Sequence, residues 1–127
     1  MSERRNIGSG SPFEATIGFS RAVRVDHRVV VSGTAPIWPD GSCDPDAAAQ
    51  ATRCIEIIVA ALADAGAKTS DVIRTRMFIT DAAHAEAVGR AHGEAFGDVR
   101  PASTIVVVSA LLDPRWVVEI EAEAIVD

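Results

Sequence analysis

The C-terminal part of the chain alternates between two kinds of side chain, and this pattern restricts the fold more than any other feature. Between Trp116 and Ile125, apolar and acidic residues take turns, with Val118, Ile120, Ala122 and Ala124 set against Glu119, Glu121 and Glu123. A period of two is that of a β-strand, so the apolar side chains point to one face and the carboxylates to the other. Such a strand requires a sheet that buries one face against a second layer.

Two segments have the period of an α-helix and can supply that layer. In the first, small and aliphatic residues form one stripe: Ala47, Ala51, Cys54, Ile55, Ile58, Leu62 and Ala65. Asp44 suits the N-cap, Pro45 the first helical position, and Gly66 the position after the helix. The second helix is expected to begin after Asp81 and to end at Gly97.

Other segments have the composition of β-strands. Residues 16–25 alternate, and residues 29–32 follow after a short polar turn, which predicts an antiparallel hairpin. Residues 72–79 alternate as well, and the apolar run 104–108 suits a central strand that is covered on both faces. The predicted elements follow one another in the order ββαβαββ. This order predicts an α+β two-layer sandwich, with two helices on one face of a mixed sheet. The opposite face of the sheet must be exposed to solvent or covered by another chain.

Length and charge limit the organisation and the partners. With 127 residues we expect one domain over residues 15–127, preceded by a loosely ordered arm over residues 1–14. A net charge of −6 with Lys68 as the single lysine makes nucleic acid an unsuitable partner. No apolar run reaches about 18 residues, so no membrane span is expected. The N-terminus has no secretory signal, and Cys43 and Cys54 have no bridging pattern, so we expect reduced thiols in a cytoplasmic protein.

No motif in the chain supports a metal or an organic cofactor. His84 and His92 are eight positions apart on the second predicted helix, about 12 Å along its axis, which is too far to share one ion. His27 lies in a turn. The nucleophile motif G-x-S-x-G and the phosphate-binding glycine motifs do not occur. We therefore expect neither a metal nor a cofactor.

The glutamate row allows two interpretations on spacing alone. The three carboxylates can form a solvated surface, or they can join a cross-strand ion network with Arg74 and Arg76, which share a face of another predicted strand. A carboxylate held in such a network and partly removed from water would have a raised pKa, which suits general acid–base work.

Several segments resemble the Rid (RidA/YjgF) family in the same order and spacing. They are Val29–Gly33 followed by Pro36, Val72–Asp81, Arg100–Ala102 and Val118–Ala122. The resemblance implies a chorismate-mutase-like fold that assembles as a homotrimer with clefts between neighbouring subunits. It also implies hydrolysis of small 2-imino or enamine acids to 2-keto acids, with release of ammonia and without a cofactor.

The resemblance also implies the residues of the site. Glu119 would orient the attacking water, and the cleft that binds the small-molecule ligand would be lined by Phe19, Ser32, Gly33, Gly89, Ser103 and Ile105. To these we add Arg76, not from the resemblance but because it shares a predicted strand face with Phe78. In many members an arginine that binds the substrate carboxylate follows Pro-Ala, and this chain has Ser103 there, which indicates an arginine-lacking subgroup. Phe19 stands in place of a tyrosine, Gly89 of an asparagine and Ile105 of a cysteine.

Because this arginine is missing, the sequence does not decide whether the protein is an enzyme or a binding protein. An ordinary 2-imino acid would bind poorly unless another cation replaces the lost guanidinium, because a bidentate arginine is the usual partner of a carboxylate. Arg76 is our first candidate, with Arg100 and Arg115 behind it, although Arg76 can instead pair with Glu119 or Glu121. The favoured function is an imine or enamine hydrolase. The alternative is a non-catalytic trimer that binds a small molecule or a protein, and an endoribonuclease is disfavoured by charge.

Overall fold

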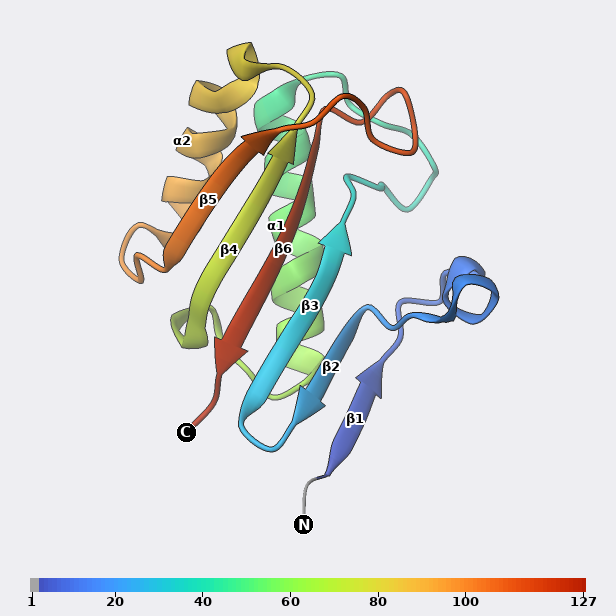
Figure 1. Cartoon of the computed structure of the whole chain (residues 1–127), viewed down its shortest axis with the longest axis vertical. Helices are drawn as coiled ribbons and strands as arrows, with labels where there is room; N and C mark the ends of the chain where they lie inside the picture. Colours follow the sequence, from blue (N-terminus) through green and yellow to red (C-terminus); the bar gives the residue numbers. More distant parts are fainter. Residues whose placement is uncertain (1–2) are drawn as a thin grey trace.

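The computed structural model describes residues 3–127 and contains one six-stranded sheet with two main helices (Figure 1). The strands are β1 (Arg4–Ile7), β2 (Ala22–Val25), β3 (Arg28–Thr34), β4 (Val72–Ile79), β5 (Ala102–Val107) and β6 (Val118–Ile125). The main helices are α1 (Ala47–Asp64) and α2 (Ala85–Phe96). Short helical turns occupy Glu14–Gly18, Thr69–Asp71 and Ala82–His84.

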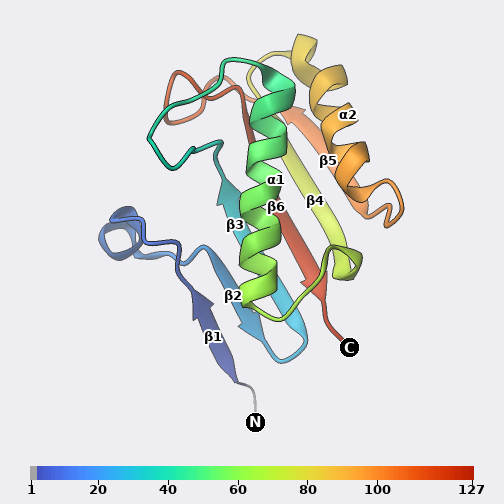
Figure 2. The same ribbon diagram turned by 180° about the vertical axis from the view of Figure 1, so that it is seen from behind.

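The sheet has the strand order β1-β2-β3-β6-β4-β5, so the alternating C-terminal strand lies inside it. Only β4 and β5 are parallel to each other, and all other neighbouring strands are antiparallel. Both main helices cover the same face, as Figure 2 shows from behind. This arrangement confirms the predicted two-layer α+β architecture.

The core lies between that face and the helices. Its largest fully buried apolar side chains are Phe96, Ile58, Leu62, Ile79 and Ile120. On β6 the predicted alternation is confirmed, because Val118, Ile120, Ala122 and Ala124 are buried and the three glutamates face the other way. The helix stripe is confirmed as well, and Gly66 follows α1 with a φ of +82°, the left-handed conformation expected of a residue after a helix end.

The N-terminal region differs from the prediction. Residues 4–7, expected in a loose arm, form β1 and pair with β2. Polar side chains do not prevent this pairing, because it uses backbone groups, and Arg5 Nη2 also donates to the Asp64 carbonyl at 2.8 Å. The strand expected from residue 16 begins only at Ala22, because Glu14–Gly18 is a π-helical turn that ends at Gly18 with a φ of +89°. The predicted order therefore gains one strand at its start.

Two further expectations are corrected. Helix α1 has Asp46 as its N-cap, with its side chain accepting from the Ala49 amide at 2.9 Å, whereas Asp44 accepts from the Asp46 amide in the preceding turn. The apolar segment expected to be a central strand is β5, which lies at the edge of the sheet with all its residues exposed. A continuous apolar run is typical of an interior strand, but it fits equally well an edge strand that is covered by something outside the chain.

Gln50 is a buried polar residue that joins α1 to the loop before β6. Its Nε2 donates to the carbonyls of Asp44 at 2.8 Å and Arg115 at 2.9 Å, and its Oε1 accepts from the Val117 amide at 2.8 Å. The side chain is fully buried. Gln50 therefore satisfies backbone groups that no strand or helix pairs, and it fixes the approach to β6.

Candidate functional site

The outer face of the sheet carries the glutamate row, and the row is mostly paired. Arg76 Nη1 contacts Glu121 Oε1 at 2.6 Å, and Arg28 Nη2 contacts Glu123 Oε2 at 2.9 Å. The cross-strand network is therefore present. Arg76, our first candidate for a ligand-binding cation, is therefore in an ion pair with Glu121, which was the structural alternative to that role.

Glu119 differs from the other two members of the row. Among residues 3–127 it has no ion-pair partner within 4.0 Å, and its side chain lies against Gly33 so closely that a Cβ on Gly33 would come 2.7 Å from Glu119 Oε2. Burial raises the pKa of Glu119 above its usual value, with the Arg21 charge opposing this effect and the Glu121 charge adding to it. The glycine at position 33 thus makes room for a partly desolvated carboxylate.

Ser32 and Phe19 complete this part of the site. The Ser32 hydroxyl donates to the Ser20 carbonyl at 2.6 Å, and the Ser32 amide donates to the Arg21 carbonyl at 2.9 Å, so Ser32 fixes the backbone beside Gly33. The Phe19 ring lies 5.7 Å from the Arg21 guanidinium carbon. The structure therefore brings together four of the predicted residues: Phe19, Ser32, Gly33 and Glu119.

Arg21 is the residue of this cluster that the sequence interpretation missed. Its Nη2 donates to the Gly33 carbonyl at 2.9 Å, and its Nε is buried without a hydrogen-bond partner, which is true of no other side-chain nitrogen or oxygen in the described part of the chain. Burial lowers the pKa of Arg21, and the nearby charges of Glu14 and Glu119 oppose that effect. Its place opposite Ser32 at the start of the hairpin becomes visible only once the register of the hairpin is known.

A second group of predicted residues lies elsewhere. Thr75 Oγ1 donates to Ser103 Oγ at 2.8 Å and lies 2.8 Å from His92 Nε2. Thr75 Oγ1 thus bridges Ser103 and His92, and the His92 ring packs on Phe96 at 4.9 Å between centroids. His92 is thus the half-buried, hydrogen-bonded histidine that its place on the apolar stripe indicates.

Gly89 and Ile105 accompany this second group. Gly89 lies one turn before His92 on α2, and a Cβ placed on it would meet nothing within 4 Å. Ile105 follows Ser103 by two on β5 and is exposed. The resemblance-derived residues therefore form two groups, one around Glu119 and one around Ser103.

The two groups lie on opposite faces of the sheet. Phe78 of β4 pairs with Glu119 on one side and with Val106 on the other, so these three side chains share the outer face. Ser103 and Ile105 are out of step with Val106 and therefore face the helix side. A single chain does not bring Ser103 to Glu119.

His92 gives the folded state a pH dependence. Burial lowers its pKa below the ordinary 6.5, so the unfolded chain takes up the proton first. The free energy of unfolding is therefore expected to fall as the pH drops from 6.5 through the folded-state pKa. Urea titrations of the wild type and His92→Gln across this range measure the difference, with His27→Gln, in the exposed β2–β3 turn, as the control. Equal pH slopes for wild type and His92→Gln would contradict the prediction.

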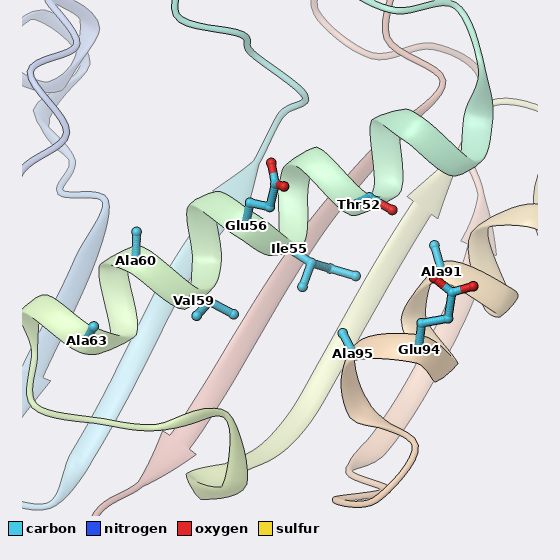
Figure 3. Close-up of a pocket in the computed structure, with 9 residues that line it drawn as sticks. All are labelled: Thr52, Ile55, Glu56, Val59, Ala60, Ala63, Ala91, Glu94 and Ala95. Atoms are coloured by element: carbon cyan, nitrogen blue, oxygen red, sulfur yellow. The ribbon is translucent and has the colours of Figure 1, made fainter.

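The molecule also has concave regions. A groove of about 530 Å³ lies between α1 and α2, and Figure 3 shows the side chains that line it, among them Ile55, Val59, Ala95 and the carboxylates of Glu56 and Glu94. It contains none of the predicted site residues. A smaller cavity of about 190 Å³ on the outer sheet face is lined by residues that include Ser32, Arg76 and Glu121.

Two features that other functions would require are absent from residues 3–127. No group of three or more histidine, cysteine or acidic side chains is arranged to hold a metal ion in this part of the chain. None of the helices found there is both long and apolar enough to pass through a bilayer. Cys43 and Cys54 are free thiols.

Comparison with known proteins identifies relatives along almost the whole length. The family model described as Endoribonuclease L-PSP matches residues 10–126. An uncharacterized protein of Streptomyces coelicolor is 41% identical over 123 residues, which is 94% of this chain and 90% of that protein.

Solved structures agree with this result. Rv2704 of Mycobacterium tuberculosis, a member of the YjgF/YER057c/UK114 family, is 44% identical, with a TM-score of 0.90 and coverage of 98% of this chain and 100% of that one. YyfA of Yersinia pestis, from the Rid protein family, is 29% identical with a TM-score of 0.84, covering 98% of this chain and all of that one. The order of motifs, the six-stranded sheet and these matches together show that the chain belongs to the YjgF/Rid family.

Proposed function

We propose that this protein is a cofactor-independent hydrolase of a small imine, enamine or related metabolite, and that Glu119 orients the attacking water. The observation that carries the proposal is the state of Glu119, a half-buried carboxylate that has no ion-pair partner among residues 3–127, in a row whose other two members are paired. Membership of the YjgF/Rid family supports the reaction class.

The chemistry requires one base and one acid in sequence. Glu119 would accept a proton from water as the oxygen adds to the carbon of a protonated C=N bond, whose π electrons become the lone pair on nitrogen. The resulting neutral carbinolamine would take the proton back from Glu119 on nitrogen and expel ammonia or an amine, while the hydroxyl proton passes to solvent or to the departing amine as the C=O bond forms. A carboxyl group with a raised pKa serves both steps, because its proton affinity lies closer to neutral pH.

A complete site in this proposal requires a second copy of the chain. The groups around Glu119 and Ser103 lie on opposite faces of the sheet, so a cleft that contains both would combine the Glu119 group of one subunit with the Ser103 group of its neighbour. The exposed apolar side chains of Ile73, Val106 and Val107 on β4 and β5 suit burial in such an interface. A homotrimer with three clefts is the assembly that we propose, in the cytoplasm, where free thiols such as Cys43 and Cys54 stay reduced.

A non-catalytic binding trimer is the second candidate, and Ser103 favours it. Its hydroxyl is neutral and bonded to Thr75, so it offers a substrate no charge at the position where many family members have arginine. A nuclease is not our proposal, although the family model is described as an endoribonuclease. A net charge of −6 with one lysine gives little attraction for a phosphate backbone.

The test is turnover by the wild-type protein. Enzymatically generated 2-iminobutyrate and a neutral ketimine of similar size are each incubated with the protein, and ammonia release is followed. We expect release from at least one of them to exceed the spontaneous rate in proportion to protein concentration. Rates equal to those with serum albumin for both imines would overturn the hydrolase proposal and leave the binding trimer.

A further inference from the structure

We propose that Arg21 is the cation of this site and binds the carboxylate of an anionic substrate, in place of the guanidinium absent at position 103. This inference rests on the proposed function for the location of the site. The inference goes beyond the proposed function because it names the residue that selects the substrate. It also states the charge of the substrate group that this residue binds.

The hydrogen bonding of Arg21 is incomplete. A guanidinium has five N–H donors. Among residues 3–127 the Arg21 side chain has one hydrogen-bond acceptor, the backbone carbonyl of Gly33, and its buried Nε–H has none. A buried donor without a partner is costly, the more so on a charged group. Nη1, by contrast, is neither bonded nor among the buried unpartnered atoms of residues 3–127, so it is the donor that a ligand oxygen can reach.

The surroundings of Arg21 hold the guanidinium in place without neutralising it by contact. Phe19 packs at 5.7 Å from its central carbon, a distance typical of cation–π contact. Glu14 and Glu119 act on the charge of Arg21 through space, but neither is within 4.0 Å ion-pair distance in the described structure. The guanidinium therefore keeps donors for a planar carboxylate, which it can bind through two parallel hydrogen bonds.

Two of the arginines considered for this role, Arg76 and Arg115, are occupied by other partners. Arg76 is paired with Glu121 at 2.6 Å, and Arg115 is paired with Asp113 at 2.9 Å and donates to the Gly41 carbonyl. Arg21, by contrast, contacts the backbone of Gly33, the same residue that packs against Glu119. A carboxylate bound there would place the adjoining carbon near the water-orienting group.

Equilibrium binding to pyruvate and to pyruvamide, its neutral amide, tests this role without requiring turnover. We expect the wild type to bind pyruvate at least tenfold more tightly than pyruvamide, and Arg21→Gln to lose that preference. Arg28→Gln removes an exposed arginine from the same sheet and is expected to keep it. Arg21→Lys retains the charge without the planar fork and should show a reduced preference, which keeps the test available if the glutamine variant does not fold.

A spectroscopic measurement on the wild type adds an independent readout. The Nε–H resonance of Arg21, assigned by its loss in Arg21→Lys, is expected to shift on addition of pyruvate and to stay in place with pyruvamide. The proposal is overturned if the wild type does not bind pyruvate, or if the preference persists in Arg21→Gln or is lost in Arg76→Gln instead. Binding that depends on Arg21 without any imine turnover would contradict the hydrolase proposal alone.

Discussion

Replacing Glu119 by glutamine is expected to lower the turnover of the imine by about 10²–10⁴-fold, the usual contribution of a positioned acid–base group. Glutamine has nearly the same shape and still fits against Gly33, but it cannot accept a proton from water. On the scale of barriers this loss is about 3–5 kcal/mol. The measurement is kcat for ammonia release, together with the midpoint of thermal unfolding to verify that the fold is kept.

Glu123→Gln is the matched control for this substitution. It makes the same change on the same face of β6, at a carboxylate paired with the exposed Arg28. Because the Arg28 end of this pair is open to solvent, the pair contributes about 0–1 kcal/mol, and this variant should keep both its stability and its turnover. A Glu119→Gln protein as active as Glu123→Gln would exclude Glu119 as the group that activates water.

Gln50→Met is expected to lower the free energy of unfolding by about 3 kcal/mol or more. Methionine fills a similar volume, so the loss comes from hydrogen bonds rather than from a cavity. The substitution leaves the carbonyls of Asp44 and Arg115 and the amide of Val117 without the partner they have in the native structure. Each buried group left unsatisfied costs about 1–3 kcal/mol.

Urea denaturation measures this effect, and Glu56→Met is its control. Glu56 is on the same helix with a side chain that is largely exposed, so its substitution should change the unfolding free energy by no more than about 0.5 kcal/mol. Hydrogen exchange at the Val117 amide should accelerate in Gln50→Met and not in Glu56→Met. Equal stability of the two variants would show that Gln50 does not hold the loop before β6.

The fold could be predicted because its main determinants are local. A period of two on β6 and β4 and a stripe on α1 specify which side of each element is buried, and a sheet with helices on one face satisfies all three. Strand β1 could not be predicted in this way. Three of its four residues are polar and exposed, with Ile7 alone packing against the core, and the strand is held mainly by backbone pairing with a segment 15 to 21 positions away.

The position of β5 shows a second limit. An apolar run indicates that both faces of a strand avoid water, but it does not say whether the chain itself provides the cover. The sequence interpretation placed residues 104–108 in the interior, whereas the structure leaves β5 exposed at the edge.

The site residues differ in the same way, because some lie in local sequence motifs and one depends on contacts between distant segments. Glu119, Ser32 and Gly33 could be found because they lie in motifs. Arg21 could not, because its significance depends on three contacts made across the fold, with the Gly33 carbonyl, the Phe19 ring and the field of Glu119. Five arginines precede residue 30 in the sequence, and nothing in their spacing separates Arg21 from the others.

The close approach of Gly33 to Glu119 has a consequence for how this protein can diverge. Every single-nucleotide change that replaces a glycine adds at least a Cβ, and at position 33 that atom would fall within 2.7 Å of the carboxylate oxygen. Because that oxygen is the far end of a flexible side chain, a larger residue at position 33 would push the Glu119 carboxylate out of its present place. The residue at position 33 therefore decides where the carboxylate lies, although it has no chemistry of its own.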